Sequence, residues 1–367
     1  MLKLLHSADW QLGLEASHVA AAAGPVREAR LESARRVVEA ASEHRVDALV
    51  LAGDLFEDNL VEEQLVRATV ELLAASAVPV FVLPGNHDPL SRDSIYLRSA
   101  WKNRPAHVVL LDRAEPFEIP GTGAFLLPAP LTRKKGFQDP TERLPAAPAG
   151  ATAAIGVAHG SLRIEGKYQS DDFPIALDAA EKRGLDYLAL GHWHGCYVHA
   201  GRTAYPGTHE TTRFGEARSG QALLVEIAGG EALPRITEVR TGLLRWETRE
   251  LDLDPAGADQ AATALLAWAE SLTGPTLLKL RTVGQSGDEA AVLLHRLEIG
   301  LAPRLLHLAV ERADVPETVA RGKVAEVAAA SPFVDGLLAD LAAADAPAAV
   351  RAEARRLLSE LVLETWT

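Results

Sequence analysis

Residues 47–54 read DALVLAGD, a short apolar run that ends in Gly53 and Asp54. A run of this length, rich in aliphatic residues and closed by turn residues, is typical of a buried β-strand. Working outward, the spacing of apolar residues predicts a strand at 2–8, helices at 27–45 and 61–77, and a strand at 79–83. The order strand, helix, strand, helix, strand predicts an α/β fold with a parallel core.

Further strands are expected downstream, while helices become rarer. The expected strands are 107–111, 123–127, 153–158, 186–190, 203–206, 221–227 and 233–240, with a helix near 174–183. Residues 128–150 are rich in Pro, Gly and charge and indicate a surface loop. This pattern favours a sandwich of two sheets with helices outside.

A second, smaller α+β domain is expected after this sandwich. We place the boundary at 243–244, which gives domains 1–243 and 244–367. The second domain should contain strands in LLRWETRELDL, TLLKLRTV and RLLHLAVE, and helices near 258–272, 288–300, 333–343 and 347–364.

Composition narrows the class of protein. The chain has 367 residues, 48% of them hydrophobic and 24% charged, which is ordinary for a globular protein. With one cysteine, Cys196, no internal disulfide and no thiolate metal cage can form, so we expect a cytoplasmic protein. No run approaches about 18 uninterrupted apolar residues, so no membrane span is expected. The net charge of −13 argues against general adhesion to nucleic acid. It does not exclude a nuclease, because bound divalent cations reverse the local sign of an acidic site.

Polar residues follow five of the expected strands. They lie in the blocks DWQ (9–11), GDLFED (53–58), GNHD (85–88), AHG (158–160) and GHWH (191–194). The carboxyl ends of strands in open α/β sheets line one edge, so these residues should converge. Carboxylate, amide and imidazole ligands suit Mn, Mg, Fe or Zn. Taken singly, an Asp after a strand is more often a helix cap and an Asn a turn residue, but five such ends together favour a metal site.

These ordered blocks resemble the calcineurin-like metallophosphoesterase superfamily. Within it, HSADWQLG, AGDLFEDN, PGNHDP and YPGTHETTRFGE resemble the DNA-repair nuclease branch of SbcD type, over about residues 1–240. The resemblance implies a two-sheet β-sandwich flanked by helices, two divalent metal ions and a smaller C-terminal capping domain that helps to grip DNA. It also admits a repair helicase or ATPase as a partner.

The resemblance assigns a role to each block. Asp54 would bridge both metals. One metal site would be completed by Asp9, Gln11 and His194, and the other by Asn86, His159 and His192. His87 would act at the scissile phosphate as a general acid or a stabiliser of the transition state, and Asp88 would orient His87. In this type of site two metals about 3.5–4 Å apart support in-line displacement at phosphorus.

Gln11 departs from the family pattern, which has His at this position. The Gln carbonyl is a neutral oxygen donor of similar reach, so we expect a harder first site and favour manganese over Mg, Fe or Zn. A stand-alone bacterial repair-associated subgroup resembles the chain in this substitution. If the Gln11 side chain turns away instead, the protein would be a silent scaffold.

Three classes of function therefore stay open. The leading class is a single-stranded DNA endonuclease or exonuclease that acts in repair. The alternatives are a small-molecule or protein phosphoesterase and a weakly active partner subunit of a repair complex. Contacts to substrate are expected from basic and imidazole side chains near the blocks, namely Arg92, Arg133, His209 and Arg213. Trp10 and Trp193 are candidates for stacking on an unpaired base.

Overall fold

The computed structural model describes residues 1–229, 232–254, 257–283, 288–312, 327–329, 331–343, 351, 354 and 357–358. The chain divides into two compact units, Met1–Trp246 and Glu247–Thr367. The first unit contains two six-stranded sheets among its described residues, and the second contains a three-stranded sheet.

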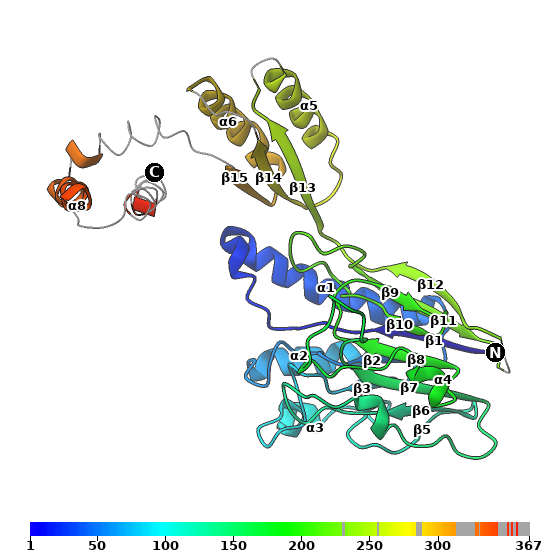
Figure 1. Ribbon diagram of the computed structural model, residues 1–367. Helices are drawn as coiled ribbons and strands as arrows, with labels where there is room; N and C mark the ends of the chain where they lie inside the picture. The colour runs from blue at the N-terminus through cyan, green and yellow to red at the C-terminus, as the bar shows by residue number, and fades with distance from the viewer. Residues whose placement is uncertain are drawn as a thin grey trace. The chain divides into compact units, whose positions relative to one another are not determined.

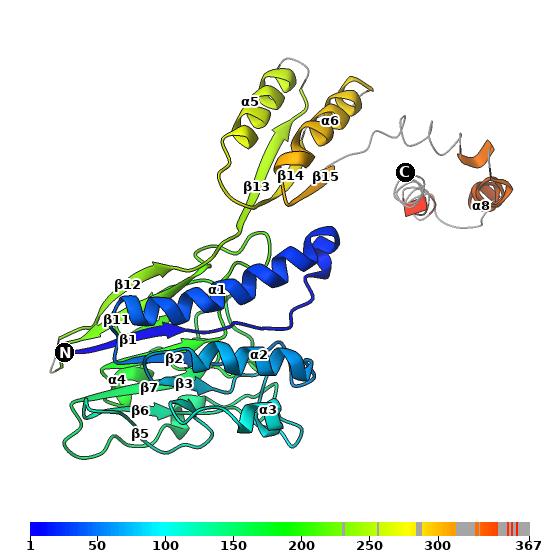
Figure 2. The ribbon, with the colours of Figure 1, turned by 180° about the vertical axis from the view of Figure 1, so that it is seen from behind.

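The first sheet has the order β12-β11-β1-β2-β3-β4. Its parallel strands are β1 (Leu2–Ser7), β2 (Ala48–Ala52), β3 (Val80–Leu83) and β4 (Val108–Leu110). The antiparallel strands β11 (Gln221–Ile227) and β12 (Arg235–Arg240) extend it beyond β1. Helices α1 (Ala23–Glu43) and α2 (Glu63–Ala74) cover one face, as Figures 1 and 2 show.

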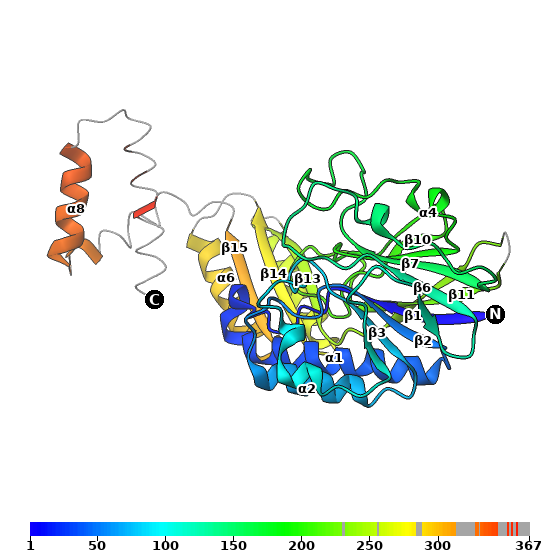
Figure 3. The same cartoon turned by 90° about the horizontal axis from the view of Figure 1, so that it is seen from below.

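The second sheet has the order β5-β6-β7-β8-β10-β9. Its strands are β5 (Phe117–Ile119), β6 (Ala124–Pro128), β7 (Ala153–His159), β8 (Tyr187–Gly191), β9 (Tyr197–His199) and β10 (Thr203–Tyr205). Strands β6, β7, β8 and β10 run parallel to one another. Figure 3 shows this sheet on the side of the first sheet opposite to α1 and α2.

Strand β2 shows why the sequence folds this way. Leu49 and Leu51 pack against residues of α1 and α2, whereas Val50 packs toward the second sheet with Ile155 and Val157. Successive side chains of a strand point to opposite faces, and here both faces are buried. A continuous apolar run is therefore required, and each buried aliphatic side chain contributes about 1.5–3 kcal/mol of burial free energy.

Short helical elements connect the strands of this unit. They are η1 (Ser17–Ala22), η2 (Ile95–Leu97), α3 (Ser99–Lys102), η3 (Pro140–Arg143) and α4 (Ala179–Lys182). The helix expected near 174–183 is thus wrong except for its last turn. Residue Ile175 instead forms a bridge with Leu162, and Phe173 has a left-handed backbone that interrupts a helix. Strands β5 and β9 are not among the strands predicted from the sequence.

The second unit has strand order β13-β14-β15 in its described part. Its elements are β13 (Arg245–Asp252), α5 (Ala258–Glu270), β14 (Thr276–Val283), α6 (Asp288–Leu301), η4 (Ala302–Arg304), β15 (His307–Arg312) and α8 (Pro332–Ala343). Leu265 of α5, Leu278 of β14 and Leu297 of α6 belong to its core. The helix expected at 347–364 lies largely outside the described residues. Among the residues that the structure describes, no helix combines the length and apolar character needed to cross a bilayer.

Candidate metal centre

The five polar blocks follow strands of both sheets. Asp9, Asp54 and Asn86 come after β1, β2 and β3 of the first sheet, whereas His159 ends β7 and His192 follows β8 of the second. The expectation that they share the edge of one sheet is therefore corrected. They converge where the carboxyl ends of parallel strands from two stacked sheets meet.

The backbone at these strand ends is strained. Asp9, Gln11, Asp54 and His192 all have positive φ angles, of 55°, 41°, 54° and 107°. Non-glycine residues rarely adopt this region, and each such residue costs about 1–3 kcal/mol unless its surroundings impose it. Backbone hydrogen bonds between the loops after β1 and β2 impose it here: Asp9 N–H donates to the Gly53 carbonyl at 3.1 Å and Gln11 N–H to the Asp54 carbonyl at 2.8 Å.

Two glycines in the blocks are required by close approach. Gly53 has a φ of 97°, and a Cβ atom there would lie 2.1 Å from Nδ1 of His159. A Cβ atom on Gly85 would lie 2.1 Å from Oδ1 of Asp54 and 2.4 Å from its backbone nitrogen. The glycine before each ligand thus lets two polar loops pack directly against one another.

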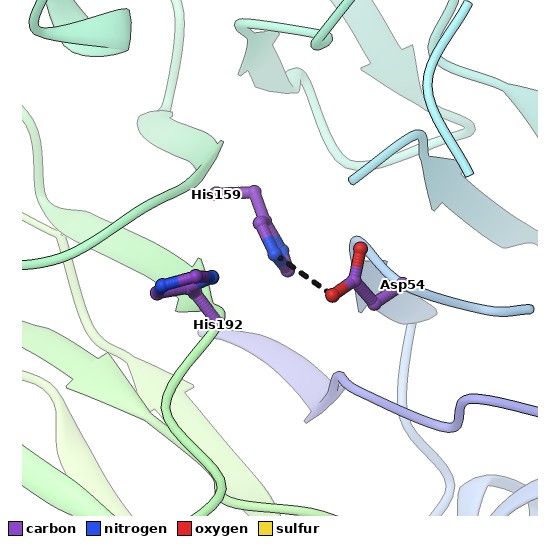
Figure 4. A group of neighbouring side chains, drawn as sticks. All are labelled: Asp54, His159 and His192. Carbon is purple, nitrogen blue, oxygen red and sulfur yellow. Dashed lines mark ion pairs between the residues drawn. The ribbon is translucent and has the colours of Figure 1, made fainter. Parts of the chain in front are cut away.

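Asp54, His159 and His192 form the core of the centre, with ligand atoms all within 4.8 Å of one another (Figure 4). Nε2 of His159 lies 3.2 Å from Oδ2 of Asp54. The Asn86 side-chain oxygen lies 2.8 Å from Nε2 of His159 and 3.0 Å from Nδ1 of His192. Four side chains from β2, β3, β7 and β8 therefore direct potential ligand atoms at a common point.

The hydrogen bonds behind the rings fix their tautomers. Nδ1 of His159 lies 2.9 Å from the Ala52 carbonyl, and Nε2 of His192 lies 2.7 Å from the Asp172 carboxylate. Both partners are acceptors, so these two nitrogens carry the protons. In the neutral rings the opposite nitrogens, which face Asn86, carry lone pairs. A divalent cation that takes the place of a proton among these atoms would find oxygen and nitrogen donors directed at it, so the arrangement fits a bound cation.

The electrostatic field at this point favours positive charge. Burial lowers the pKa of His159, but the attraction of Asp54, its hydrogen bond and Asp9 outweigh burial and raise that pKa to about 9. Burial raises the pKa of Asp54, yet His159 and His87 together lower it overall. Asp9 behaves differently, because burial raises its pKa and the neighbouring Asp54 charge adds to that effect. Buried carboxylates of this kind need a cationic partner.

The residues expected at the other metal lie beside this core. Both carboxylate oxygens of Asp9 accept the backbone N–H of His192, at 2.9 and 3.0 Å. Nδ1 of His194 lies 2.8 Å from the Glu216 carboxylate, which leaves its Nε2 available as a ligand atom. The Gln11 side chain is buried, with 4% of the residue exposed, and has no hydrogen bond to another described side chain or backbone group. That Gln11 binds a metal stays a prediction.

His87 lies at the rim of the centre. Its backbone N–H donates to Oδ1 of Asp54 at 2.8 Å, and its Nδ1 lies 2.8 Å from the Glu57 carbonyl and 3.7 Å from the Glu57 carboxylate. With Nδ1 engaged and 36% of the side chain exposed, Nε2 is the nitrogen free to meet a substrate. Glu57 therefore orients His87, a role that the sequence analysis gave to Asp88.

The Asp88 carboxylate makes other contacts. It accepts hydrogen bonds from the backbone N–H groups of Gly85 at 2.7 Å and Phe56 at 3.1 Å, and from the Tyr96 hydroxyl at 2.5 Å. Burial and the nearby Asp54 charge raise the pKa of Asp88 to about 6. Asp88 is fully buried and ties the loop after β3 to the loop after β2, so it positions the ligand loops, and none of its described hydrogen bonds goes to the His87 ring.

Comparison with known proteins identifies the class of enzyme. The model of the calcineurin-like phosphoesterase family matches residues 2–196. The chain belongs to the calcineurin-like phosphoesterase family. It is therefore a phosphoesterase, hence a hydrolase, of a family that uses divalent metals, and the resemblance drawn from the sequence blocks is confirmed.

Three relatives of this phosphoesterase are informative. The uncharacterized metallophosphoesterase YhaO of Bacillus subtilis is 27% identical over 77% of this chain and 69% of its own. The DNA double-strand break repair protein Mre11 of Archaeoglobus fulgidus is 36% identical over 25% of this chain and 20% of its own. The Mre11 protein of Aeropyrum pernix is 27% identical over 70% of this chain and 65% of its own. The two Mre11 matches span less than two thirds of those proteins.

The residues expected to hold substrate in the phosphoesterase are not grouped. His209 is fully buried, its Nε2 lies 2.8 Å from the Arg30 carbonyl, and its ring packs 5.2 Å from that of Trp10. Burial lowers the pKa of His209 to about 3, with Arg30 adding to the effect. A buried, neutral His209 does not reach a phosphate, and the buried Trp10 does not stack on a base, so both expectations are corrected.

The three arginines lie at the surface. Arg92 is exposed, and Arg213 is exposed with its Nε 3.4 Å from the Glu216 carboxylate. Arg133 lines a surface pocket. Trp193, the second stacking candidate, packs its ring 4.6 Å from that of Tyr205. Contacts of Arg92, Arg133 and Arg213 with substrate stay predictions.

Sequence reasoning missed three acidic residues that hold the imidazoles of the phosphoesterase, two through their carboxylates and Glu57 through its backbone carbonyl. These are Glu57 behind His87, Asp172 behind His192 and Glu216 behind His194. Glu57 and Glu216 lie inside the blocks GDLFED and THETTRFGE, so their proximity in sequence was a usable signal. Asp172 lies in the segment YQSDDFP, where no pattern marks it.

Proposed function

We propose that this phosphoesterase is a manganese-dependent DNA nuclease with two metal sites. Asp54 would contact both ions, with Asp9, Gln11 and His194 at one and Asn86, His159 and His192 at the other. The observation that carries the proposal is the convergence of potential ligand atoms of Asp54, Asn86, His159 and His192 on one point. Divalent ions in such sites polarise a phosphate and lower the pKa of water.

The protein residues supply the proton chemistry. His87 is held at Nδ1 by the Glu57 carbonyl, with the Glu57 carboxylate 3.7 Å away, so its outer nitrogen points away from these anchors. In its protonated form His87 would donate from Nε2 to the leaving oxygen of a phosphodiester. No side-chain nucleophile is needed, because water attacks phosphorus in this reaction class.

DNA is the proposed substrate because two relatives carry the name DNA double-strand break repair protein. We favour single strands and a role in repair, where a helicase or ATPase would be the partner. A phosphomonoesterase is the competing possibility, since the metal ligands alone serve either ester. The family match over residues 2–196 includes GNHD after β3 and GHWH after β8, which carry Asn86 and His192 of the proposed centre.

The test compares substrates and metals on the purified full chain. Bis(p-nitrophenyl) phosphate, p-nitrophenyl phosphate and a labelled single-stranded oligonucleotide are each assayed with Mn²⁺, Mg²⁺ and Zn²⁺. We expect cleavage of the diester and the oligonucleotide, strongest with Mn²⁺. Asp54→Asn should abolish both activities, and Asp93→Asn, an exposed acid after the GNHDP block, should leave them unchanged. Preferential hydrolysis of the monoester would overturn the nuclease proposal.

A further inference from the structure

A surface pocket of about 290 Å³ lies in the first unit, beside the long loop after β6. It is lined by Thr132, Arg133, Gly136, Phe137, Gln138, Arg143 and Phe173. Its volume is near the lower limit for small-molecule sites, which suits a single nucleotide unit better than a larger ligand.

Two cations of this pocket have no carboxylate partner among the described residues. The one described hydrogen bond of Arg143 runs from Nη2 to the Pro130 carbonyl at 3.5 Å. Burial, and then the charge of Arg133, lower the pKa of Arg143, so the two guanidinium groups repel one another. Lys135 in the same loop is different, because it pairs with Asp171 at 2.6 Å. In a chain of net charge −13, two neighbouring arginines without a carboxylate leave room for an external anion.

An exposed aromatic ring stands next to these cations. Phe137 is 72% exposed and lines the pocket, so its ring is accessible to a ligand there. Gly136 packs closely against the Phe173 ring, since a Cβ atom on Gly136 would be 2.3 Å from Cε1 of Phe173. Guanidinium groups that bind phosphate, together with an exposed ring, are the elements of a site for unpaired nucleotides.

The wall of the pocket is joined to the metal centre. Phe173 N–H donates to the Gly136 carbonyl at 2.9 Å, and the preceding residue, Asp172, holds Nε2 of His192 at 2.7 Å. On the other side, a Cβ atom on Gly160, the residue after His159, would lie 2.3 Å from the Phe173 carbonyl oxygen. The segment that lines the pocket therefore also contacts the loops that carry His159 and His192.

We propose that this pocket binds one nucleotide of a single-stranded DNA substrate. Arg133 and Arg143 would hold its phosphate, and its base would stack on Phe137. The proposal rests on the proposed function, because it takes nucleic acid as the substrate of the neighbouring centre. A stacked base must be unpaired, so the pocket selects single strands over duplex.

Fluorescence anisotropy of a labelled single-stranded oligonucleotide tests this proposal on the full chain in EDTA, where binding is measured without cleavage. Phe137→Ala should weaken binding by about 5- to 150-fold, the range for loss of one stacked base, and leave its salt dependence unchanged. The double variant Arg133→Gln/Arg143→Gln should weaken binding and reduce the slope of log K against log salt by about 0.7, as expected for one lost phosphate contact. Lys134→Gln is the matched control, because it removes a cation of the same loop that does not line the pocket.

The outcomes separate this proposal from the nuclease proposal. Hydrolysis of bis(p-nitrophenyl) phosphate by Lys134→Gln should equal that of the wild type, because Lys134 does not line the pocket. The proposal that the pocket binds a nucleotide would be overturned if the pocket variants bound the oligonucleotide as tightly as Lys134→Gln. It would also be overturned if the wild type did not bind the oligonucleotide. If the wild type binds through Arg133, Arg143 and Phe137 but cleaves no diester, the nuclease proposal fails and the pocket stands. Thermal melting confirms that each variant is folded.

Discussion

Replacing Glu216 by Gln should weaken one metal site and spare the other. The Glu216 carboxylate lies 2.8 Å from Nδ1 of His194 and accepts the backbone N–H and hydroxyl of Thr212 at 2.7 and 2.5 Å. These contacts use both carboxylate oxygens. A Gln side chain offers one oxygen and one NH₂ group, so it cannot accept from both His194 and the Thr212 backbone.

Each orientation of that amide has a cost. If its oxygen stays with the Thr212 N–H, the NH₂ group meets Nδ1 of His194 and forces the proton to Nε2, which removes the lone pair proposed to bind metal. If its oxygen turns to His194, the Thr212 N–H loses its acceptor, and the remaining neutral hydrogen bond is roughly half as strong as the charged one. Loss of a carboxylate behind a ligating His typically lowers metal affinity about 10- to 100-fold, which corresponds to about 1.4–2.8 kcal/mol.

Calorimetric titration of the metal-free protein with Mn²⁺ measures this effect directly. The wild type should show two sites, and Glu216→Gln should show one unchanged site and one weakened by that factor, with diester hydrolysis recovered at high Mn²⁺. Glu238→Gln is the control, because Glu238 pairs with Arg218 at 2.5 Å and contacts none of the proposed ligands. Two unchanged sites in Glu216→Gln would refute the role of Glu216, and equal weakening of both would refute its assignment to the His194 site.

Three further predictions concern single residues. His87→Ala should keep both metals and lose about 10²- to 10⁴-fold in turnover, and loss of metal in this variant would make His87 a ligand. Gln11→Ala should lower metal content and activity while Gln11→His keeps both, and a Gln11→Ala enzyme with two metals and the wild-type rate would show that Gln11 is no ligand. His6, whose Nδ1 lies 2.8 Å from the Tyr187 hydroxyl, has its pKa lowered to about 3 by burial. Below pH 6.5 the unfolded chain therefore binds a proton that the native state excludes. The free energy of unfolding should for this reason decrease as the pH is lowered. Urea unfolding in EDTA measures the slope of the free energy of unfolding against pH. Between about pH 5.5 and 4 this slope should be smaller in His6→Gln by about 1.4 kcal/mol per pH unit, and an unchanged slope contradicts burial of a neutral His6.

The parallel strands of the first sheet could be predicted because the signal for each strand lies in its own short stretch of sequence. Each of β1, β2 and β3 is a short apolar run followed by a polar block, and α1 repeats buried residues at helical spacing from Val26 to Ala41. Strands β5 and β9, FEI and YVH, lie at the two edges of the second sheet and are only partly buried, so no apolar run marks them in the sequence. The segment after 174 was misjudged because a distant partner, Leu162, fixes Ile175 in a bridge.

The proposed metal ligands could be predicted from their sequence blocks, but the residues that hold the site side chains in place could not. A block places a side chain at a strand end, and the fold then brings the ends together. Burial of His209 depends on α1, through the Arg30 carbonyl, and the contacts of Asp88 depend on Tyr96 and on the loop after β2. Such partners lie far away in the sequence or have no pattern of their own. The roles of His209 and Asp88 therefore had to be corrected once their surroundings were known.

The strained backbone at the centre connects the sheets to the chemistry. Asp9, Gln11, Asp54 and His192 each hold a conformation that costs about 1–3 kcal/mol, against a total stability of about 5–15 kcal/mol for a typical domain. A loop free to relax would adopt ordinary angles and turn these side chains away. It cannot relax here, because the loops after β1 and β2 are hydrogen-bonded to each other and Gly53 packs against His159 of the opposite sheet. The buried strands therefore stabilise a strained backbone at the proposed ligands, which supports the prediction that these four residues have a functional role.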